Sequence, residues 1–281
     1  MDNGSLMLIP VGGLANRMRA IASAYTLTRQ VSGRLQVVWF QDWALNAPFH
    51  SVFIKPEQPM LREATLKDRL FYDRARRRNL WLPALAQRLL FERRIMEQEI
   101  GGLLNRQFDF AQWMQGHRCY MSSYSLIVPV QDSLYRQLFV PVMEVMSAVS
   151  RYQEQFSAHT VGLHIRRTDH VMSIADSPDE LFVKRVETEI EAHADTKVFL
   201  ATDSESVKQL FRLRFGDRII MQQAAARRDS IEGIRGGLID MYTLARTDRL
   251  YGTTGSSFAE IAACLGGKPL EVLSLQEQSD R

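Results

Sequence analysis

The sequence lacks the features of membrane-spanning and disulfide-stabilised proteins. No apolar run approaches the ~20 residues that a membrane-spanning helix needs. The N-terminal residues have no basic region and too short an apolar stretch for a signal peptide. Only two cysteines, Cys119 and Cys264, occur in 281 residues, which argues against a disulfide framework or a cysteine zinc site. We therefore expect a cytoplasmic protein.

Several catalytic signatures are missing as well. The patterns G-x-S-x-G and H-E-x-x-H of serine hydrolases and zinc proteases do not occur. No D-x-D occurs either, and the nearest pattern is Asp203-Ser204-Glu205. Acidic pairs of the D-x-D kind hold a divalent metal on the diphosphate in many nucleotide-sugar enzymes. A diphosphate bound here would have to be neutralised by other groups.

The composition that remains is that of an ordinary soluble globular protein, with 46% hydrophobic and 24% charged residues. The length favours two domains. Apolar β runs alternate with helical patterns, which is typical of α/β folds with parallel sheets. We expect an N-terminal domain over residues 1–150 and a Rossmann-like C-terminal domain over residues 151–281. A long helix predicted over Leu134–Tyr152 would form the hinge.

Charge is unevenly distributed between the two halves. The net charge is +3, with +6 in residues 1–150 and −3 in residues 151–281. The basic excess lies in Arg62–Arg94, a stretch with a helical pattern. Its leucines would form one apolar face: Leu80, Leu85, Leu89 and Leu90.

Two interpretations of Arg62–Arg94 are open. The first is a solvated basic face. The second is a docking surface for anionic lipid or an anionic acceptor, which would make the protein peripheral to the inner membrane face. Nucleic acid is not an expected partner, because the chain has no DNA- or RNA-binding motif and no aromatic residues interleaved as stacking platforms.

A glycine pair closes the first predicted strand. Gly12 and Gly13 follow the apolar run Leu6–Val11 and precede a helical pattern over Leu14–Ser32. Glycine lets the backbone come close to a ligand, and the start of a helix offers unpaired N–H groups. The loop has neither the G-x-G-x-x-G pattern nor a Walker lysine, so alone it is a weak indication of phosphate binding. Asn16 either faces a ligand over this loop or is an exposed helix residue.

The strand predicted over Val161–Ile165 ends in fixed positive charge. Alternation along a strand places His164 and Arg166 on one face and Arg167 on the other. We therefore assign Arg166 to a ligand and expect Arg167 to form an internal ion pair. The carboxyl ends of strands are where α/β sheets bind ligands, and a guanidinium suits carboxylate or phosphate. The alternative is a salt-bridged strand end with Asp169 as the partner.

Further polar segments end the next predicted strands of the second half. Thr202-Asp203 and Thr253–Ser257 would lie on the same edge of a parallel sheet as Arg166. The hydroxyls, glycine and helix start of Thr253–Ser257 suit an anion, although an ordinary helix cap has the same residue types. Asp240 could accept hydrogen bonds from a ribose or a guanine, or else face solvent. Another helix is predicted from Pro178, with Ser177 as its N-cap.

Together these motifs resemble the fucosyltransferase superfamily. That group holds the α-1,2, α-1,6 and protein O-fucosyltransferases and the rhizobial enzymes that fucosylate chitin oligosaccharides. The matching segments follow the expected order: Gly12–Arg17, His164–Asp169, Ala201–Asp203, Leu238–Asp240 and Gly252–Phe258. Residues 42–118 match nothing in that group.

The resemblance implies a GT-B-like α/β fold, in which two Rossmann-like domains with parallel sheets face a cleft. It implies an inverting, metal-independent enzyme that moves fucose from GDP-fucose to a glycan hydroxyl. The second domain would bind the nucleotide sugar, and the first would lie on the acceptor side. No metal and no cofactor beyond the donor substrate are expected.

The resemblance also implies roles for single residues. Arg166 would bind the β-phosphate and neutralise the departing GDP. His164 and Asp240 would contact the ribose and the guanine. The diphosphate and its surroundings would be reached from the second domain by Ser256, Ser257 and Phe258, and from the first by Gly12, Gly13 and Asn16.

The general base is where the chain departs from this group. The α-1,6 enzymes carry a glutamate shortly after the histidine of the motif, and Ile174 stands at that position here. Asp176 is the nearest match. We expect either that Asp176 takes the proton of the acceptor hydroxyl, or that stabilisation of the leaving group carries most of the catalysis. Asp169 is expected to orient Arg166 or Arg167.

Two other functions stay open on the sequence. One is a glycosyltransferase that uses another nucleotide-sugar donor. The other is a non-catalytic nucleotide-sugar binding protein, which the missing glutamate motivates. The acceptor, the linkage and the oligomeric state are not indicated.

Overall fold

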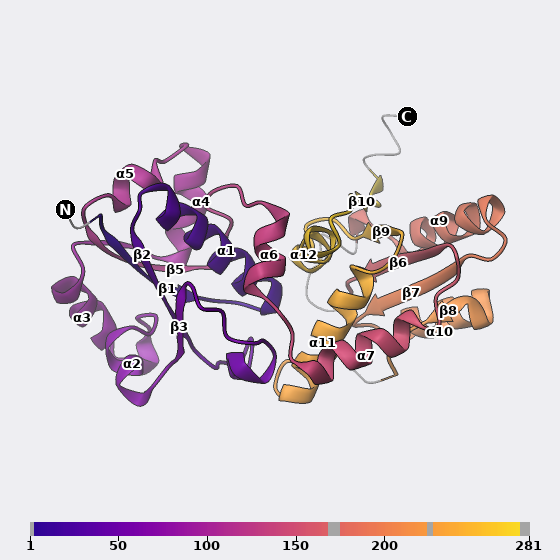
Figure 1. The fold of residues 1–281 in the computed structure, drawn as a ribbon, viewed down its shortest axis with the longest axis horizontal. Helices are drawn as coiled ribbons and strands as arrows, with labels where there is room; N and C mark the ends of the chain where they lie inside the picture. Colours follow the sequence, from indigo (N-terminus) through magenta and orange to yellow (C-terminus); the bar gives the residue numbers. More distant parts are fainter. Residues whose placement is uncertain (1–2, 168–174, 224–226, 276–281) are drawn as a thin grey trace. The chain divides into compact units, whose positions relative to one another are not determined.

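The computed structural model describes residues 3–167, 175–223 and 227–275. The chain forms two compact units, Met1–Val140 and Pro141–Arg281 (Figure 1). Each unit contains one five-stranded sheet in which every strand pair is parallel. The predicted α/β class with two parallel sheets is thus confirmed.

The sheet of the first unit has the strand order β3-β2-β1-β5-β4. Its strands are β1 (Ser5–Pro10), β2 (Arg34–Trp39), β3 (Met60–Glu63), β4 (Arg93–Ile95) and β5 (Arg118–Ser123). The central strands are buried toward their carboxyl ends, because helices and loops cover both faces of a parallel sheet.

The two faces of this sheet are covered differently. Helix α1 (Leu14–Gln30) packs against β1 and β2, with α5 (Phe110–Met114) and α6 (Asp132–Leu138) in contact with it. On the opposite face, aromatic rings fill the core, and the Phe91 and Tyr120 centroids lie 5.5 Å apart. The other helices of the unit are α2 (Leu66–Phe71), α3 (Leu82–Leu90), α4 (Glu97–Asn105) and the 3-10 helices Phe49–Ser51 and Arg77–Asn79.

The helical prediction for Arg62–Arg94 is wrong. The stretch begins in β3 and ends in β4, with the short helices α2 and α3 between them. Leu80 and Trp81 break the helical path because both adopt left-handed backbone conformations, with φ of 50° and 59°. The spacing of the leucines in the sequence predicts a helix but gives no indication of such a turn.

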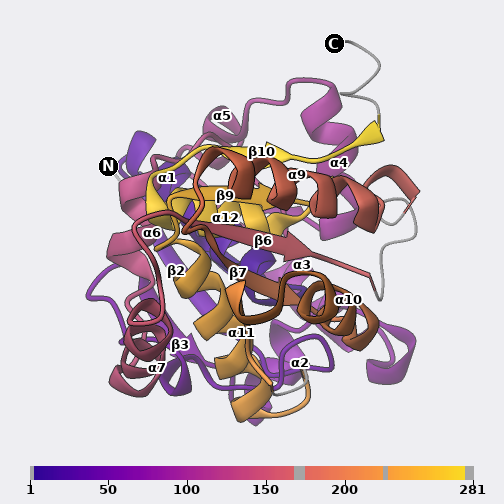
Figure 2. The ribbon, with the colours of Figure 1, turned by 90° about the vertical axis from the view of Figure 1, so that its right-hand side faces the viewer.

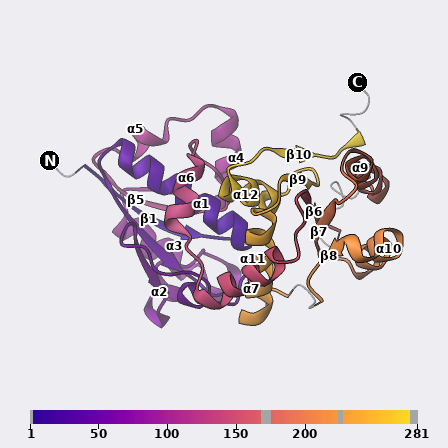
Figure 3. The same cartoon turned by 45° about the vertical axis from the view of Figure 1, so that its right-hand side comes forward.

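The sheet of the second unit has the order β10-β9-β6-β7-β8. Its strands are β6 (Thr160–Ile165), β7 (Lys197–Thr202), β8 (Ile219–Ile220), β9 (Arg249–Gly252) and β10 (Leu270–Val272). On one face, α9 (Asp179–Ala192) and α10 (Glu205–Phe215) bury their apolar stripes against β6 and β7 (Figure 2). The other face carries α7 (Met143–Gln153), α11 (Ile231–Leu244) and α12 (Ser257–Gly266) (Figure 3).

Two predictions about the junction need correction. The predicted helix Leu134–Tyr152 is two helices, α6 and α7, because Pro141 lies between them and cannot continue a helix. α7 packs against α11, so the division falls at Val140/Pro141 rather than at residue 150. Farther along, Pro178 itself occupies the N-cap of α9, one position later than expected.

Both sheets contain a topological switch point, where the strand order reverses beside the first strand of the unit. In the first unit it lies between β1 and β5, and in the second between β6 and β9. Open α/β sheets bind ligands at the carboxyl ends of the strands that flank such a point. The loops after β1, β6 and β9 carry the polar motifs identified in the sequence, so the topology places those motifs where a ligand site is expected.

Candidate functional site

The carboxyl edge of the second sheet gathers the predicted polar loops. His164, near the end of β6, is paired with Ala201 of β7 and Gly252 of β9. The Thr253 N–H donates to the His164 carbonyl at 3.3 Å, which continues the β6–β9 pairing into the loop before α12. On the other side, the Asp203 carboxylate accepts from the Arg167 N–H at 2.8 Å. The expectation that these three loops share one edge is confirmed.

His164 is held by the start of α12. Its Nδ1 lies 3.0 Å from the Ser256 hydroxyl, and its ring stacks on Phe258 with centroids 4.6 Å apart. The Ser256 hydroxyl is also the N-cap of α12 and accepts from the Ala259 N–H at 3.3 Å. Since that hydroxyl already accepts one hydrogen bond, its own proton is available for Nδ1. This arrangement favours the tautomer of His164 that carries its proton on Nε2.

The electrostatics of His164 agree with a neutral ring. Burial, with a further contribution from the nearby Arg166 charge, lowers its pKa to about 4, against a smaller opposite effect from Asp203. At neutral pH the imidazole is therefore an uncharged donor through Nε2. Such a group can donate a hydrogen bond to a ribose or phosphate oxygen.

The two arginines after β6 have different surroundings. Arg167 donates from Nε to Asp179 at 2.8 Å and from Nη2 to the Ser177 carbonyl at 2.8 Å, and its guanidinium lies 6.0 Å from the centre of the Phe182 ring. The prediction that Arg167 forms an internal ion pair is confirmed, with Asp179 as its partner. Arg166 is half-buried, and its charge lies close enough to His164 to lower the pKa of that imidazole.

Asp176 is tied to the same loop as Ser256. It accepts a hydrogen bond from the Thr254 hydroxyl at 2.6 Å. The Ser177 hydroxyl lies 3.2 Å from both the backbone nitrogen and the hydroxyl of Thr254. Asp176 is thus positioned at the carboxyl edge of the sheet, although α9 begins beyond it. The predictions for Asp169 and for the Ile174 position fall outside the described residues.

A cavity of about 530 Å³ opens beside the end of β7. This volume is in the range of small-molecule sites. Its lining comes from β7, from the segment after β8, and from α10 and α11: Leu200, Thr202, Lys208, Gln222, Arg227, Ser230, Glu232, Gly233, Gly236, Gly237 and Asp240. Of these, Thr202 and Asp240 were identified from the sequence.

Two glycines, Gly236 and Gly237, keep the α11 side of this cavity open, and a third, Gly233, is required by close packing. A Cβ at Gly237 would contact nothing within 4 Å, and one at Gly236 would meet only the Gln222 side chain at 3.6 Å. At Gly233 a Cβ would lie 2.4 Å from the Arg227 carbonyl, so the backbone itself requires glycine. A glycine-rich helical segment in a sequence is only a weak indication of a cavity, because the sequence does not show which groups lie opposite the glycines.

Asp240 is a hydrogen-bonded carboxylate and not the solvent-facing residue considered from the sequence. The Gln222 amide donates to Asp240 Oδ1 at 2.6 Å and to the Gly236 carbonyl at 2.7 Å. Burial raises the pKa of Asp240 to about 7, although Gln222 and Lys208 lower it. The carboxylate therefore exists partly protonated near neutral pH, poised to gain from a donor in the cavity.

In the first unit, the Gly12-Gly13 loop has the conformation that glycine permits. Gly12 has φ of +82°, and Gly13 is the N-cap of α1. A Cβ at Gly12 would lie 3.2 Å from the Asn16 side chain, which accepts from Arg19 at 3.0 Å. The backbone at Gly12, which carries no side chain, therefore lies next to the Asn16 amide.

Arg17 holds this loop in place through hydrogen bonds of its buried side chain, a role that was not identified from the sequence. The fully buried guanidinium donates to the Gly12 carbonyl at 2.9 Å, to the Phe40 carbonyl at 2.5 Å and to Asp42 at 2.9 Å. Burial lowers its pKa to about 10, although Asp42 raises it. Asp42 also binds Arg74 at 3.0 Å.

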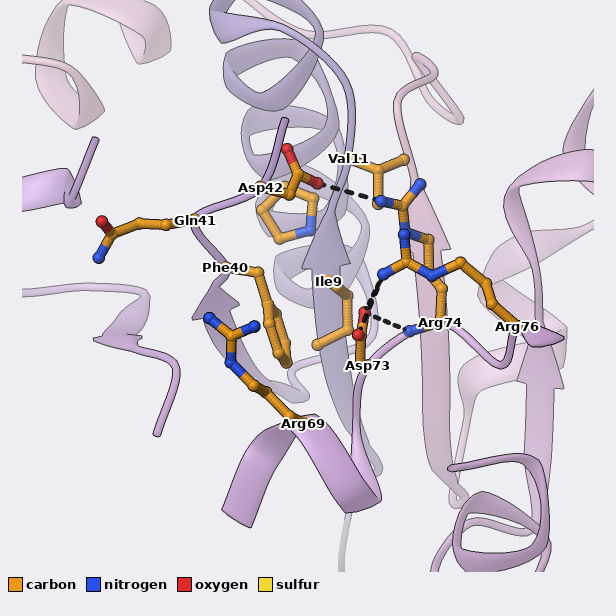
Figure 4. Close-up of a pocket in the computed structure, with 10 residues that line it drawn as sticks. Ile9, Val11, Phe40, Gln41, Asp42, Arg69, Asp73, Arg74 and Arg76 are labelled. Atoms are coloured by element: carbon orange, nitrogen blue, oxygen red, sulfur yellow. Dashed lines mark hydrogen bonds and ion pairs between the residues drawn. The ribbon is translucent and has the colours of Figure 1, made fainter. Parts of the chain in front are cut away.

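A small hollow lies beside this network, at the carboxyl ends of β1 and β2 (Figure 4). Arg74 and Arg76 line it from the segment after α2, and Arg76 pairs with Asp73 at 2.8 Å. The Gly12-Gly13 loop and this hollow belong to the first unit, whereas His164 and the cavity belong to the second. That the two sets face one cleft stays a prediction.

Within residues 3–167, 175–223 and 227–275, no group of three or more His, Cys, Asp or Glu side chains could hold a metal ion.

We predict that Ser256→Ala lowers the free energy of unfolding by about 1–2 kcal/mol, because it removes both the α12 cap and the hydrogen bond to His164. Ser257→Ala is the matched control, since Ser257 is the first residue of α12 and not its cap. Urea denaturation of the three proteins measures the difference. Equal stabilities of the two variants would contradict the capping role.

We predict that Asp240→Asn stabilises the protein by roughly 1–3 kcal/mol at about pH 8 and progressively less below pH 7. The raised folded pKa means that the folded state keeps a proton that the unfolded state has lost, so wild-type stability falls as pH rises from about 4 to about 7. Denaturation at several pH values measures this. A gain that does not change with pH would show that Asp240 ionises normally.

No family model matches the chain, and no curated protein sequence matches it. Solved structures do. NodZ α-1,6-fucosyltransferase soaked with GDP-fucose aligns with a TM-score of 0.64 and 20% identity, over 94% of this chain and 92% of that chain. A mutant of Arabidopsis thaliana FUT1 in complex with GDP aligns with 0.60 and 15%, over 96% and 70%. POFUT1 in complex with GDP aligns with 0.57 and 11%, over 97% and 99%. The chain therefore shares the α/β fold of these fucosyltransferases, as the resemblance of its motifs implied.

Proposed function

We propose that this protein is an inverting, metal-independent glycosyltransferase that moves fucose from GDP-fucose to a glycan hydroxyl. The observation that carries the proposal is the cluster of His164, Arg166 and the capped start of α12 at the β6–β9 switch point, beside the α11 cavity. The fold is shared with proteins whose structures contain GDP or GDP-fucose.

The cavity beside β7 supplies a nucleoside site. Asp240 can accept from the N1–H and N2–H groups of guanine or from a ribose hydroxyl, and Gln222 holds its carboxylate in place at 2.6 Å. The open α11 glycines leave room for a planar base. Hydrogen bonds donated by a bound nucleotide would offset the desolvation that raises the pKa of Asp240. Nucleotide binding therefore favours the ionised form of Asp240.

The start of α12 and Arg166 supply the diphosphate site. Ser257 and Phe258 begin α12, where backbone N–H groups have no partner within the helix and attract anions. Ser256 contributes to this site by capping α12, because its hydroxyl is already hydrogen-bonded to His164 and to the Ala259 N–H. Arg166 places a fixed positive charge at the same edge. In the transfer step the acceptor oxygen forms a bond to the anomeric carbon while the bond to the β-phosphate oxygen breaks, and Arg166 stabilises the charge that develops on the departing GDP.

Deprotonation of the acceptor is assigned to Asp176. The Thr254 hydrogen bond orients its carboxylate at the edge that carries Arg166. In an inverting displacement such a carboxylate takes the proton of the attacking hydroxyl. The acceptor glycan itself is assigned to the first unit. Gly12, Gly13 and Asn16 keep their predicted role toward the donor diphosphate and its surroundings, to which they offer backbone and amide hydrogen bonds.

We predict that Arg166→Ala lowers the rate of transfer or donor hydrolysis by roughly 10²–10³, because one electrostatic donor to a developing anion is lost. GDP affinity, measured calorimetrically, should fall too, since the same charge binds the ground-state diphosphate. Arg167→Ala is the comparison variant, and we expect it to lower stability more than GDP affinity because its partner is Asp179. Near-normal turnover and GDP affinity in Arg166→Ala would remove the basis of the assignment.

The same titration separates the rival functions. Tighter binding of UDP than of GDP would replace the donor and exclude the guanine contact of Asp240. Binding of GDP-fucose with neither hydrolysis nor transfer to any glycan of a panel would favour the non-catalytic binding protein.

We predict that Asp176→Asn lowers kcat by about 10²-fold or more with little change in GDP affinity, since a general base acts on the acceptor and not on the donor. Thr254→Val serves as its control. It removes the hydrogen bond and keeps the carboxylate, so its effect should be smaller. Unchanged kcat in Asp176→Asn would assign the catalysis to stabilisation of the leaving group.

A further inference from the structure

The α2–α3 surface of the first unit exposes several large apolar side chains. We define it by Leu66, Leu70, Leu80, Trp81, Leu85 and Leu89, all of them exposed. Trp81 is 60% exposed and Leu89 83%. The two helices contact each other (Figure 1), so these side chains belong to one region. Several large apolar side chains exposed on two helices in contact are typical of an interaction site.

Helix α3 is oriented against its own amphipathic pattern. Its buried residues are Pro83 and Gln87, and the Gln87 amide donates to the Asp73 carbonyl at 2.9 Å. Leu85 and Leu89, one turn apart, lie on the exposed side. The fold buries a glutamine and leaves the leucines in water. The apolar face of α3 is therefore not part of the described core.

The charges around this surface are positive. Lys67, Arg69, Arg77 and Arg88 are exposed. The neighbouring carboxylates are engaged in internal pairs, Asp68 with Arg62 at 2.6 Å and Asp73 with Arg76 at 2.8 Å. Exposed basic groups thus surround exposed leucines and a tryptophan.

We propose that the α2–α3 surface docks on the headgroup region of an anionic lipid bilayer. Leucine side chains would enter the acyl boundary, Trp81 would lie at the headgroup level, and the basic residues would contact anionic lipid. A second copy of the chain would bring the same positive charge to the contact, so charge complementarity favours lipid. No helix among the described residues has the length and apolarity to cross a membrane, and α3, at 9 residues, suits the surface. The proposal does not depend on the proposed function.

The test is co-sedimentation with vesicles rich in phosphatidylglycerol, compared with phosphatidylcholine alone. We expect binding only to the anionic vesicles, weakened by salt. Arg88→Glu/Leu89→Gln should lower the partition coefficient at least about tenfold, because it reverses one charge and removes one apolar anchor. The chain offers a matched control, Arg212→Glu/Leu213→Gln, in the last turn of α10. Leu213 is 88% exposed, and we expect that pair to leave binding unchanged.

A second readout locates the contact. A vesicle-dependent blue shift of tryptophan fluorescence should disappear in Trp81→Phe. The proposal is overturned by equal binding to both vesicle types, by no binding to either, or by equal losses in the two double variants. It is also overturned if the protein dimerises without lipid and Arg88→Glu/Leu89→Gln abolishes the dimer, since a second copy would then cover this surface.

Discussion

The parallel pairing of β6 with β9 is the constraint on which the candidate site depends. These strands are far apart in the sequence, and their pairing sets His164 beside Gly252. The backbone bond from Thr253 to His164 carries the pairing past the last strand residue, and the Ser256 cap then lies within reach of the imidazole. Arg166, the start of α12 and the α11 cavity meet at one edge because the strand order reverses there.

Buried or half-buried arginines fix the loops on both sheets, and they do so by binding backbone as well as carboxylates. Arg17 holds the Gly12 and Phe40 carbonyls together with Asp42, while Arg167 holds the Ser177 carbonyl and Asp179. A guanidinium has five donors in a rigid plane and can satisfy several acceptors that strand ends leave unpaired. In each unit, one arginine has a structural role next to the groups that are proposed to contact a ligand.

The sequence motifs predicted more of the second unit than of the first. In the second unit, strands and helices alternate regularly, so the positions of β6, β7, α10 and α12 follow from apolar runs and caps. Between residues 42 and 118, strands of three or four residues alternate with helices of three to nine residues. Such short elements carry too little periodicity to be recognised, and β3 and β4 form only because neighbouring strands offer them a ladder.

The chain's own order of residues was enough to identify the α/β class, the His164-x-Arg166 strand end, the internal role of Arg167 and the glycine loop. These features are local, because alternation along a strand and glycine's access to positive φ act over a few residues. The Gln222–Asp240 bridge, the open α11 face, the burial of Arg17 and the outward leucines of α3 became visible only in three dimensions. Each depends on what packs opposite a side chain, and that partner is distant in the sequence.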